Sequence, residues 1–137
     1  QFHALQLACS VADFHAEGRA CFHPVDNLAS YHDQVEEADK AAKKFSETRL
    51  LVWLNHFNHI LESNPTKSGF CVGSRLTYCD VTVFYVLLAA EAQFPSAWSA
   101  VDLPAIKSFL ERIKALPAIS AHLNSPDAKP FAGNSMM

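Results

Sequence analysis

Apolar side chains follow helical spacing along most of this sequence, and residues 2–22 show the pattern first. Two neighbouring stripes run through that segment: Phe2, Leu5, Cys9 and Ala12 on one, and Leu7, Val11 and Phe14 beside it. Recurrence at intervals of three and four residues predicts a helix. Because the two stripes together cover most of the circumference, we expect this helix to be central, and the turn-forming residues 23–27 to end it.

A second long helical segment covers residues 30–64, which contain neither Pro nor Gly. The pattern predicts one long helix or two collinear pieces, with Ser30 as the N-cap and Asp33 three residues later. The first half is charged and rich in Ala, so we expect it to be solvated outside. The second half carries apolar residues at helical spacing that predict entry into the core: Leu50, Leu54, Phe57 and Leu61.

A carboxylate stands at the head of the most apolar run, where Asp80 precedes residues 81–90. Thr77 and Asp80 have the spacing of a capping box, in which each side chain bonds the other residue's amide. The carboxylate would also meet the positive end of the helix dipole. We therefore expect Asp80 to begin a buried helix over residues 78–92. A catalytic acid is the alternative interpretation, but capping explains the position of Asp80 in full.

The remaining segments complete a helical pattern. Residues 65–75 and 93–102 predict loops, and residues 103–116 predict an amphipathic helix. The inward positions of that helix are Ile106, Phe109, Leu110 and Ile113. Pro117 suits the first turn of a short helix over residues 117–123, and an irregular tail follows. The chain is therefore predicted to be one all-α domain over residues 1–137, with about five helices around a buried central helix.

Composition narrows the classes of partner and compartment. The chain has 137 residues and a formal net charge of −3, which gives no reason to expect nucleic acid or an anionic membrane as a partner. No apolar run reaches membrane-spanning length. The four Cys form no C-x-x-C motif, so we expect reduced thiols and an intracellular location, cytoplasmic or organellar. Since the sequence opens with Gln1 and not Met, we expect that residues preceded it.

Several stretches, taken in order, resemble the C-terminal helical domain of glutathione transferases of the sigma, mu and pi kind. "GFCVGSRLTYCDVTVFYVL" is similar to the loop and buried helix of that domain, and "LPAIKSFLERIKALPAISAHLNS" to the two helices that follow. "LACSVADF" resembles its first helix, where an acid precedes a large apolar residue. The capping box is common by itself, but the box, the preceding "VG", the "RIKALPAI" and their order together are specific. The resemblance covers essentially the whole chain.

The resemblance implies a division of labour between two domains. In this family a thioredoxin-like N-terminal domain binds glutathione and supplies the residue that activates its thiol. The helical domain supplies most of the pocket for the electrophile and much of the dimer contact. Residues 1–137 contain no pattern of the thioredoxin-like domain, so no catalytic residue is predicted in this chain. Glutathione is implied as a co-substrate, and no cofactor is expected.

The resemblance also implies site residues. Asp13 matches the acid that reaches across a dimer to the amine of glutathione, although an ordinary exposed helix residue would fit as well. Phe14, Phe22 and His23 fall near the second-substrate pocket, while His23 also suits a helix C-terminus. Phe131, with Met136 and Met137, lies where the tail of several relatives closes over that pocket, or where a tail is disordered. His56 and His59 share a helix face, but without a third ligand we predict no metal site.

Three functions remain open at this point. The chain could be a binding and assembly module that is not catalytic by itself, which is the interpretation we favour from the sequence. It could be the electrophile-binding half of an active glutathione transferase, or a carrier of apolar small molecules. In each case we expect an exposed apolar face on the helix at residues 2–22, and therefore a protein partner or a homodimer.

Overall fold

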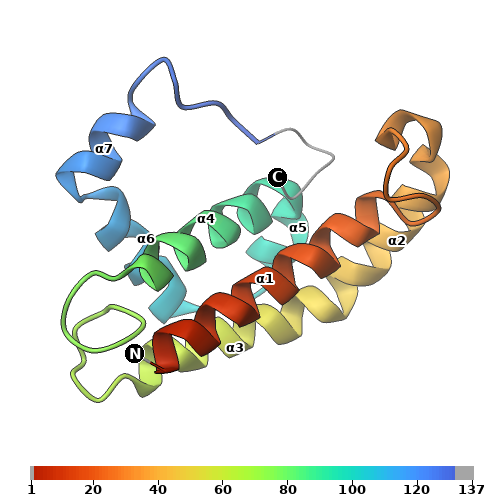
Figure 1. The fold of residues 1–137 in the computed structure, drawn as a ribbon. Coiled ribbons are helices and arrows are strands. Elements are labelled where there is room, and N and C mark those ends of the chain that lie inside the picture. Colours follow the sequence, from red (N-terminus) through yellow and green to blue (C-terminus); the bar gives the residue numbers. More distant parts are fainter. Residues whose placement is uncertain (1, 132–137) are drawn as a thin grey trace.

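The computed structural model describes residues 2–131, and every regular element in that range is helical (Figure 1). The elements are α1 (Phe2–Phe22), the 3₁₀-helix η1 (Tyr31–Asp33), α2 (Val35–Glu47), α3 (Arg49–Ser63), α4 (Tyr78–Gln93), α5 (Pro95–Ser99), α6 (Pro104–Lys114) and α7 (Pro117–Leu123). The predicted all-α class is therefore confirmed. The described residues form more helices than the five expected.

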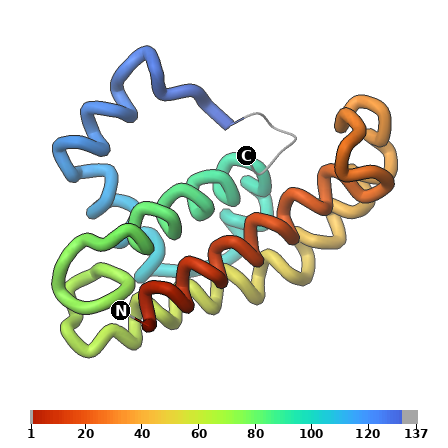
Figure 2. The backbone as a smooth tube through the Cα atoms, viewed as in Figure 1, coloured from red at the N-terminus to blue at the C-terminus, as the bar shows by residue number. Residues whose placement is uncertain are grey.

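Helix α4 is the buried central helix of the bundle. It packs against α1, α5 and α6, and its core face includes Cys79, Val83 and Leu87, each completely inaccessible to solvent. Helix α1 runs antiparallel to α2 and α3 along the other side of the bundle (Figures 1 and 2). Helix α3 packs in turn on α6, which closes the core around α4.

A line of aromatic rings connects α1, α2, α3 and the end of α4. Phe22 stacks on Phe94, with ring centroids 5.7 Å apart, and Phe94 contacts Phe45 at 5.4 Å. Phe45 stacks on Phe14 at 6.3 Å, and Phe14 meets Phe57 edge-on at 5.7 Å. Offset and edge-to-face aromatic contacts add to the stabilisation gained from burial. These rings therefore hold the α1–α2–α3 side of the molecule together.

The structure corrects the expectation that α1 is central. Its second stripe faces the core, where Leu7, Val11 and Phe14 are buried. Its first stripe faces outward: Phe2 is 89% exposed, Leu5 is 59% exposed, and Cys9 and Ala12 are also exposed. The sequence pattern could not choose between two apolar stripes. The ring of Phe14 decides, because it fits among the aromatic side chains of α2 and α3.

The second predicted segment is two helices, as one of its two alternatives stated, but it begins differently. Ser30 caps η1 by accepting a hydrogen bond from the His32 amide at 3.2 Å, and α2 starts only at Val35. The break between α2 and α3 falls at Thr48, whose hydroxyl donates to the Lys44 carbonyl oxygen at 2.6 Å. Hydroxyl side chains that bond nearby carbonyls compete with helical hydrogen bonds, which explains a break at this position.

The C-terminal half follows the prediction apart from one added helix. Residues 93–102, expected to be a loop, contain α5, which Pro95 begins at a position where its missing N–H costs nothing. Helix α6 buries its four predicted inward residues, and Pro117 begins α7 in the same way as Pro95 begins α5.

Candidate functional site

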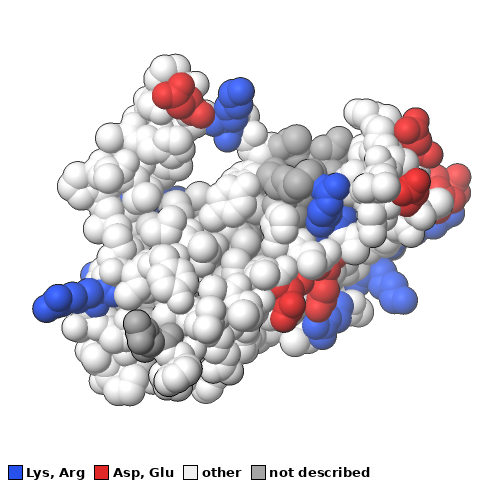
Figure 3. Space-filling view, viewed as in Figure 1, with Lys and Arg blue, Asp and Glu red and all other residues white. Residues whose placement is uncertain are grey.

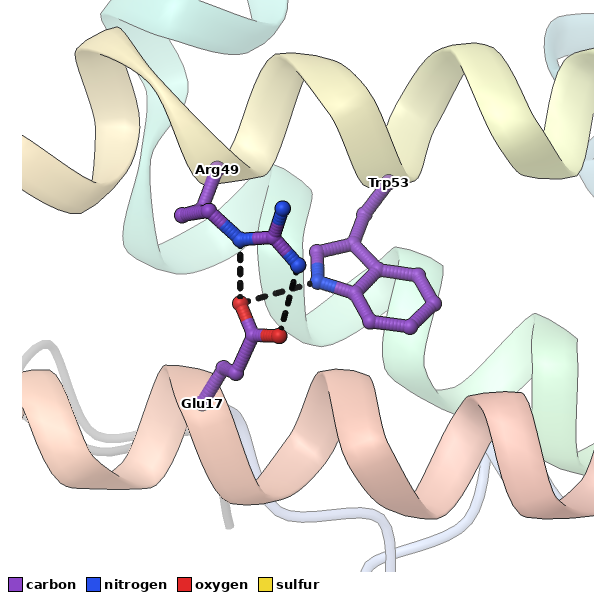
Figure 4. A network of polar contacts seen from close by, with 3 residues as sticks. All are labelled: Glu17, Arg49 and Trp53. Carbon is purple, nitrogen blue, oxygen red and sulfur yellow. Dashed lines mark hydrogen bonds and ion pairs between the residues drawn. The ribbon is translucent and has the colours of Figure 1, made fainter.

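A polar network joins α1 to α3 near the position where an acid was predicted to act (Figure 4). Arg49 donates two hydrogen bonds to the carboxylate of Glu17, from Nε to Oε2 at 2.8 Å and from Nη2 to Oε1 at 2.7 Å. The indole Nε1 of Trp53 donates to the same Oε2 at 3.1 Å. The hydrogen bond from Arg49 holds the pKa of Glu17 below its ordinary value. Three donors on one carboxylate fix the register of α1 against α3.

Asp13 lies one helical turn before Glu17 and is exposed. Among the described residues, no hydrogen bond or ion pair engages its carboxylate, so it could accept a cation from outside the chain. The predicted contact with the amine of glutathione stays a prediction. Glu17 carries the structural role on this face of α1. Local sequence patterns did not indicate that role, because the partners of Glu17 lie more than thirty residues away.

The apolar residues predicted for a second-substrate pocket do not come together around one cavity. Phe14 is completely buried among Phe45, Trp53 and Phe57. Phe22 lies about two turns further along α1 and is 5% exposed. Their place in the family's pocket remains a prediction. In this structure Phe14 belongs to the core.

Phe22 lines a shallow hollow of about 410 Å³ between α1, α2 and α5. Tyr31, Asp39 and Phe94 are among its other lining residues, and the hydroxyl of Tyr31 donates to Asp39 Oδ1 at 3.2 Å. Burial, together with this neighbouring carboxylate, raises the pKa of Tyr31 above its ordinary value. The hollow therefore combines an aromatic wall with a phenol that stays protonated at neutral pH.

His23 and Phe131 lie apart from that hollow's lining. The Nδ1 atom of His23 is 3.2 Å from the Ala29 carbonyl oxygen, so the imidazole braces the loop after α1. Phe131 packs on Tyr85 of α4 with ring centroids 5.4 Å apart. This contact holds the segment that follows α7 against α4. Met136 and Met137, also expected near the pocket, lie outside the described residues.

The capping box at the start of α4 is confirmed. Asp80 is completely buried, and its Oδ2 accepts hydrogen bonds from the Thr77 amide at 2.7 Å and the Thr77 hydroxyl at 3.0 Å. The other oxygen, Oδ1, accepts from the amide of Cys71 at 2.7 Å. Asp80 thus holds the preceding loop as well as the helix, a second role that local spacing could not reveal.

Asn64 organises the same loop from its other end. Its amide nitrogen donates to the carbonyl oxygens of Phe70 and Gly73, each at 2.8 Å, and its Oδ1 accepts from the amide and the hydroxyl of Thr66. The Gly73 oxygen also accepts from the hydroxyls of Thr66 and Ser68, each at 2.6 Å. Residues 64–80 are therefore a rigid connection between α3 and α4.

The four thiols are free, and three of them are buried. Burial raises the pKa of Cys21 to about 12 and raises the pKa values of Cys71 and Cys79 as well. These three side chains are therefore thiols, not thiolates, near neutral pH. Cys9 is the exposed thiol of the four and lies on α1. Over the described residues there is no cluster of three potential metal ligands and no helix suited to cross a membrane.

Two exposed apolar surfaces are the most prominent surface features. The outer face of α1 consists of Phe2, Leu5, Cys9, Ala12 and Ala16, all exposed. On α4 and just before it, exposed apolar side chains form a second set: Leu76, Tyr78, Val81 and Tyr85. Figure 3 shows few charged side chains over the first half of α1 and over α4. Uncharged apolar surface of this kind marks an interface more often than open solvent contact.

Comparison with known proteins identifies the class to which this fold belongs. The model of the family "Glutathione S-transferase, C-terminal domain" matches residues 19–126. The chain therefore belongs to the glutathione S-transferase family and corresponds to its C-terminal helical domain.

Curated relatives agree with that assignment. A glutathione S-transferase of Tyrophagus putrescentiae is 29% identical over 70% of this chain and 41% of its own length. Those of Plasmodium yoelii yoelii and Plasmodium falciparum (isolate 3D7) are 25% and 27% identical, over 90% and 91% of this chain and 50% and 54% of their own lengths. The chain spans about half the length of the relatives it matches.

Proposed function

We propose that this chain is the helical half of a glutathione S-transferase and that it contributes apolar surface for the second substrate. The proposal rests on the family assignment and on relatives named glutathione S-transferase, of which the chain covers the equivalent of one half. The residues offered to the substrates are Asp13, exposed on α1, and Phe22 and His23 at the end of that helix. Activation of the glutathione thiol is assigned to a thioredoxin-like domain.

The match to glutathione S-transferases about twice the length of this chain carries the proposal, and the outer face of α1 is consistent with it. A helical domain that normally packs against a second domain or subunit leaves apolar residues exposed when it stands by itself. Phe2 and Leu5 are exposed in that way, and the acid predicted to meet glutathione lies on the same helix. The contact surface and the predicted glutathione contact thus share one element.

The most direct test is the transcript upstream of the codon for Gln1. We expect the reading frame to continue upstream and to encode a thioredoxin-like domain. That domain should end shortly before α1. An unrelated upstream region would contradict the proposal and favour the second candidate, a docking module without chemistry. The exposed apolar surfaces support that second candidate equally, because a module of this kind also needs an interface.

Titration calorimetry tests the division of labour on the chain itself. We expect glutathione to bind weakly or not at all, because Asp13 offers one exposed ion pair, which contributes at most about 1 kcal/mol. Micromolar binding that is lost in Asp13→Asn would place the glutathione site within this chain and contradict the assignment of glutathione binding to another domain.

A further inference from the structure

The shallow hollow between the end of α1, α2 and α5 has charged groups on one wall and aromatic rings on another. Its volume, about 410 Å³, lies in the range of small-molecule sites, roughly 300–1,000 Å³. Helix α2 supplies the charges, from Asp39 and Lys43. The rings belong to Phe22, Tyr31 and Phe94. A ligand in this hollow would therefore meet a negative charge, a positive charge and an apolar surface together.

The two charges are neighbours on α2 that do not pair with each other. Residues four apart on a helix lie on the same face, with Cβ atoms about 5–6 Å apart. Within the described chain no ion pair joins Asp39 to Lys43. The ammonium of Lys43 lies 4.0 Å from Glu47 Oε1, which is too far for a hydrogen bond. Lys43 therefore keeps its N–H donors for a ligand.

The carboxylate of Asp39 is oriented by Tyr31. The Tyr31 hydroxyl donates to Asp39 Oδ1 at 3.2 Å, and among the described residues no hydrogen bond engages Oδ2. Burial and the neighbouring carboxylate raise the pKa of Tyr31, so the phenol keeps the proton that it donates. Tyr31 lies on η1, which Ser30 caps and which Gln34 ties to the backbone of the loop after α1. Oδ2 is thus an acceptor held at a defined position beside the aromatic wall.

The aromatic wall is part of the protein core. Phe22 and Phe94 are 5% and 7% exposed, and their rings stack with centroids 5.7 Å apart. Phe94 also contacts Phe45 at 5.4 Å, so the core supports this wall from behind. A site that is formed before its ligand arrives loses less ordering entropy on binding. The hollow therefore has a fixed apolar surface next to its two charges.

We infer that this hollow binds a free α-amino acid with an apolar side chain. Such a molecule carries an ammonium, a carboxylate and its side chain on one carbon atom. The ammonium would donate to Asp39 Oδ2, the carboxylate would accept from Lys43, and the side chain would lie on the aromatic wall. An exposed ion pair contributes little by itself, so binding requires both charges and the side chain together. Of the residues assigned to the proposed transferase function, only Phe22 lines this hollow, so the inference does not depend on that function.

Three probes with the same phenyl group test the two charges. L-phenylalanine carries both, 3-phenylpropionate lacks the ammonium, and 2-phenylethylamine lacks the carboxylate. Titrations of the full chain, followed by backbone amide shifts in nuclear magnetic resonance spectra, give both the Kd and the location of binding. We expect L-phenylalanine to shift amides of η1, α2 and α5 and to bind at least about tenfold more tightly than either of the other probes.

Removal of either charge should abolish that preference. Asp39→Asn keeps an oxygen that can accept from the Tyr31 hydroxyl, and it should bind L-phenylalanine no more tightly than 3-phenylpropionate. Lys43→Met should bind it no more tightly than 2-phenylethylamine. Glu37→Gln and Lys44→Met are the matched controls, because both residues are exposed on α2 outside the lining of the hollow. They should leave all three Kd values unchanged.

Ser96→Trp should block the hollow from the side of α5, whereas Ala100→Trp, directly after that helix, should not. Circular dichroism melts identify which variants are folded. The inference would be overturned by L-phenylalanine that shifts no amides around the hollow, or that binds no more tightly than the other two probes. Undiminished affinity for L-phenylalanine in folded Asp39→Asn or Lys43→Met would overturn it as well, because the charges would then have no part in binding.

Discussion

Replacing Asp80 by Ala tests the most buried polar contact in the molecule. The carboxylate accepts hydrogen bonds from the Thr77 amide and from the Cys71 amide, each at 2.7 Å, and no part of Asp80 reaches solvent. Loss of a helix cap costs about 1–2 kcal/mol. The Cys71 amide would also lose its partner inside the protein, which costs a further 1–3 kcal/mol or so.

The combined effect on the free energy of unfolding is therefore about 3 kcal/mol, more than a cap by itself would give. For a domain of this size the melting temperature should fall by about 12 °C. Asp80→Asn should lower the free energy of unfolding by less, because its amide oxygen can still accept a hydrogen bond from one of the two N–H groups. Thermal melts followed by circular dichroism measure the change.

Asp13→Asn is the matched control, because that carboxylate is exposed on α1 and should change stability by less than about 0.5 kcal/mol. An Asp80→Ala melting temperature within a degree or two of the wild type (a margin below what 1 kcal/mol produces) would refute the assigned role of Asp80. A loss equal to that of a cap alone would show that the Cys71 contact contributes nothing.

Two further predictions concern the polar and thiol groups of α1. Glu17→Gln should lower stability by about 0.5–1 kcal/mol at neutral pH, since the pair with Arg49 is partly exposed. Because the folded state lowers the pKa of Glu17, that stabilisation exists above the unfolded-state pKa and is lost as the pH falls through the folded-state pKa. Urea titrations across this range should show the difference between mutant and wild type vanish in acid, and a constant difference would contradict the ion-pair account. In the native chain, Ellman's reagent should react rapidly with Cys9, and it should react with the three buried thiols only after unfolding. Rapid reaction of the native Cys9→Ser variant would show that a core thiol is accessible.

The sequence predicted correctly those features that depend on interactions within one helix or one cap. Caps and periodicity within one element predicted the start of α4 after Thr77 and the start of α7 at Pro117. They also predicted the buried face of α6 and the inward residues of α3. The class of fold followed from the same patterns. The sequence did not predict the break at Thr48 or the short helix α5. Each depends on a few hydrogen bonds that compete closely with a continuous helix in the first case and a loop in the second.

The tertiary contacts explain the rest of the differences. The two apolar stripes on α1 do not determine which face of the helix is buried. The contacts of Phe14 with the rings of Phe45 on α2 and Phe57 on α3 determine it. Glu17 has its partners on α3, and the hollow lined by Phe22 has walls from three separate segments. Gln34 is buried and bonds the backbone of Val25 and Asp26, which a polar residue between two charged stretches does not suggest. Each of these features depends on residues outside the helix or segment whose pattern was interpreted.

Sedimentation velocity at several protein concentrations tests most directly whether the outer face of α1 is an interface. Phe2 and Leu5 project from this face into solvent in the single chain. The wild type is expected to self-associate as concentration rises, or to require a partner to remain in solution. Leu5→Asp should shift it towards monomer with the fold intact. A wild-type chain that stays monomeric at high concentration and sediments like Leu5→Asp would contradict the role assigned to this face.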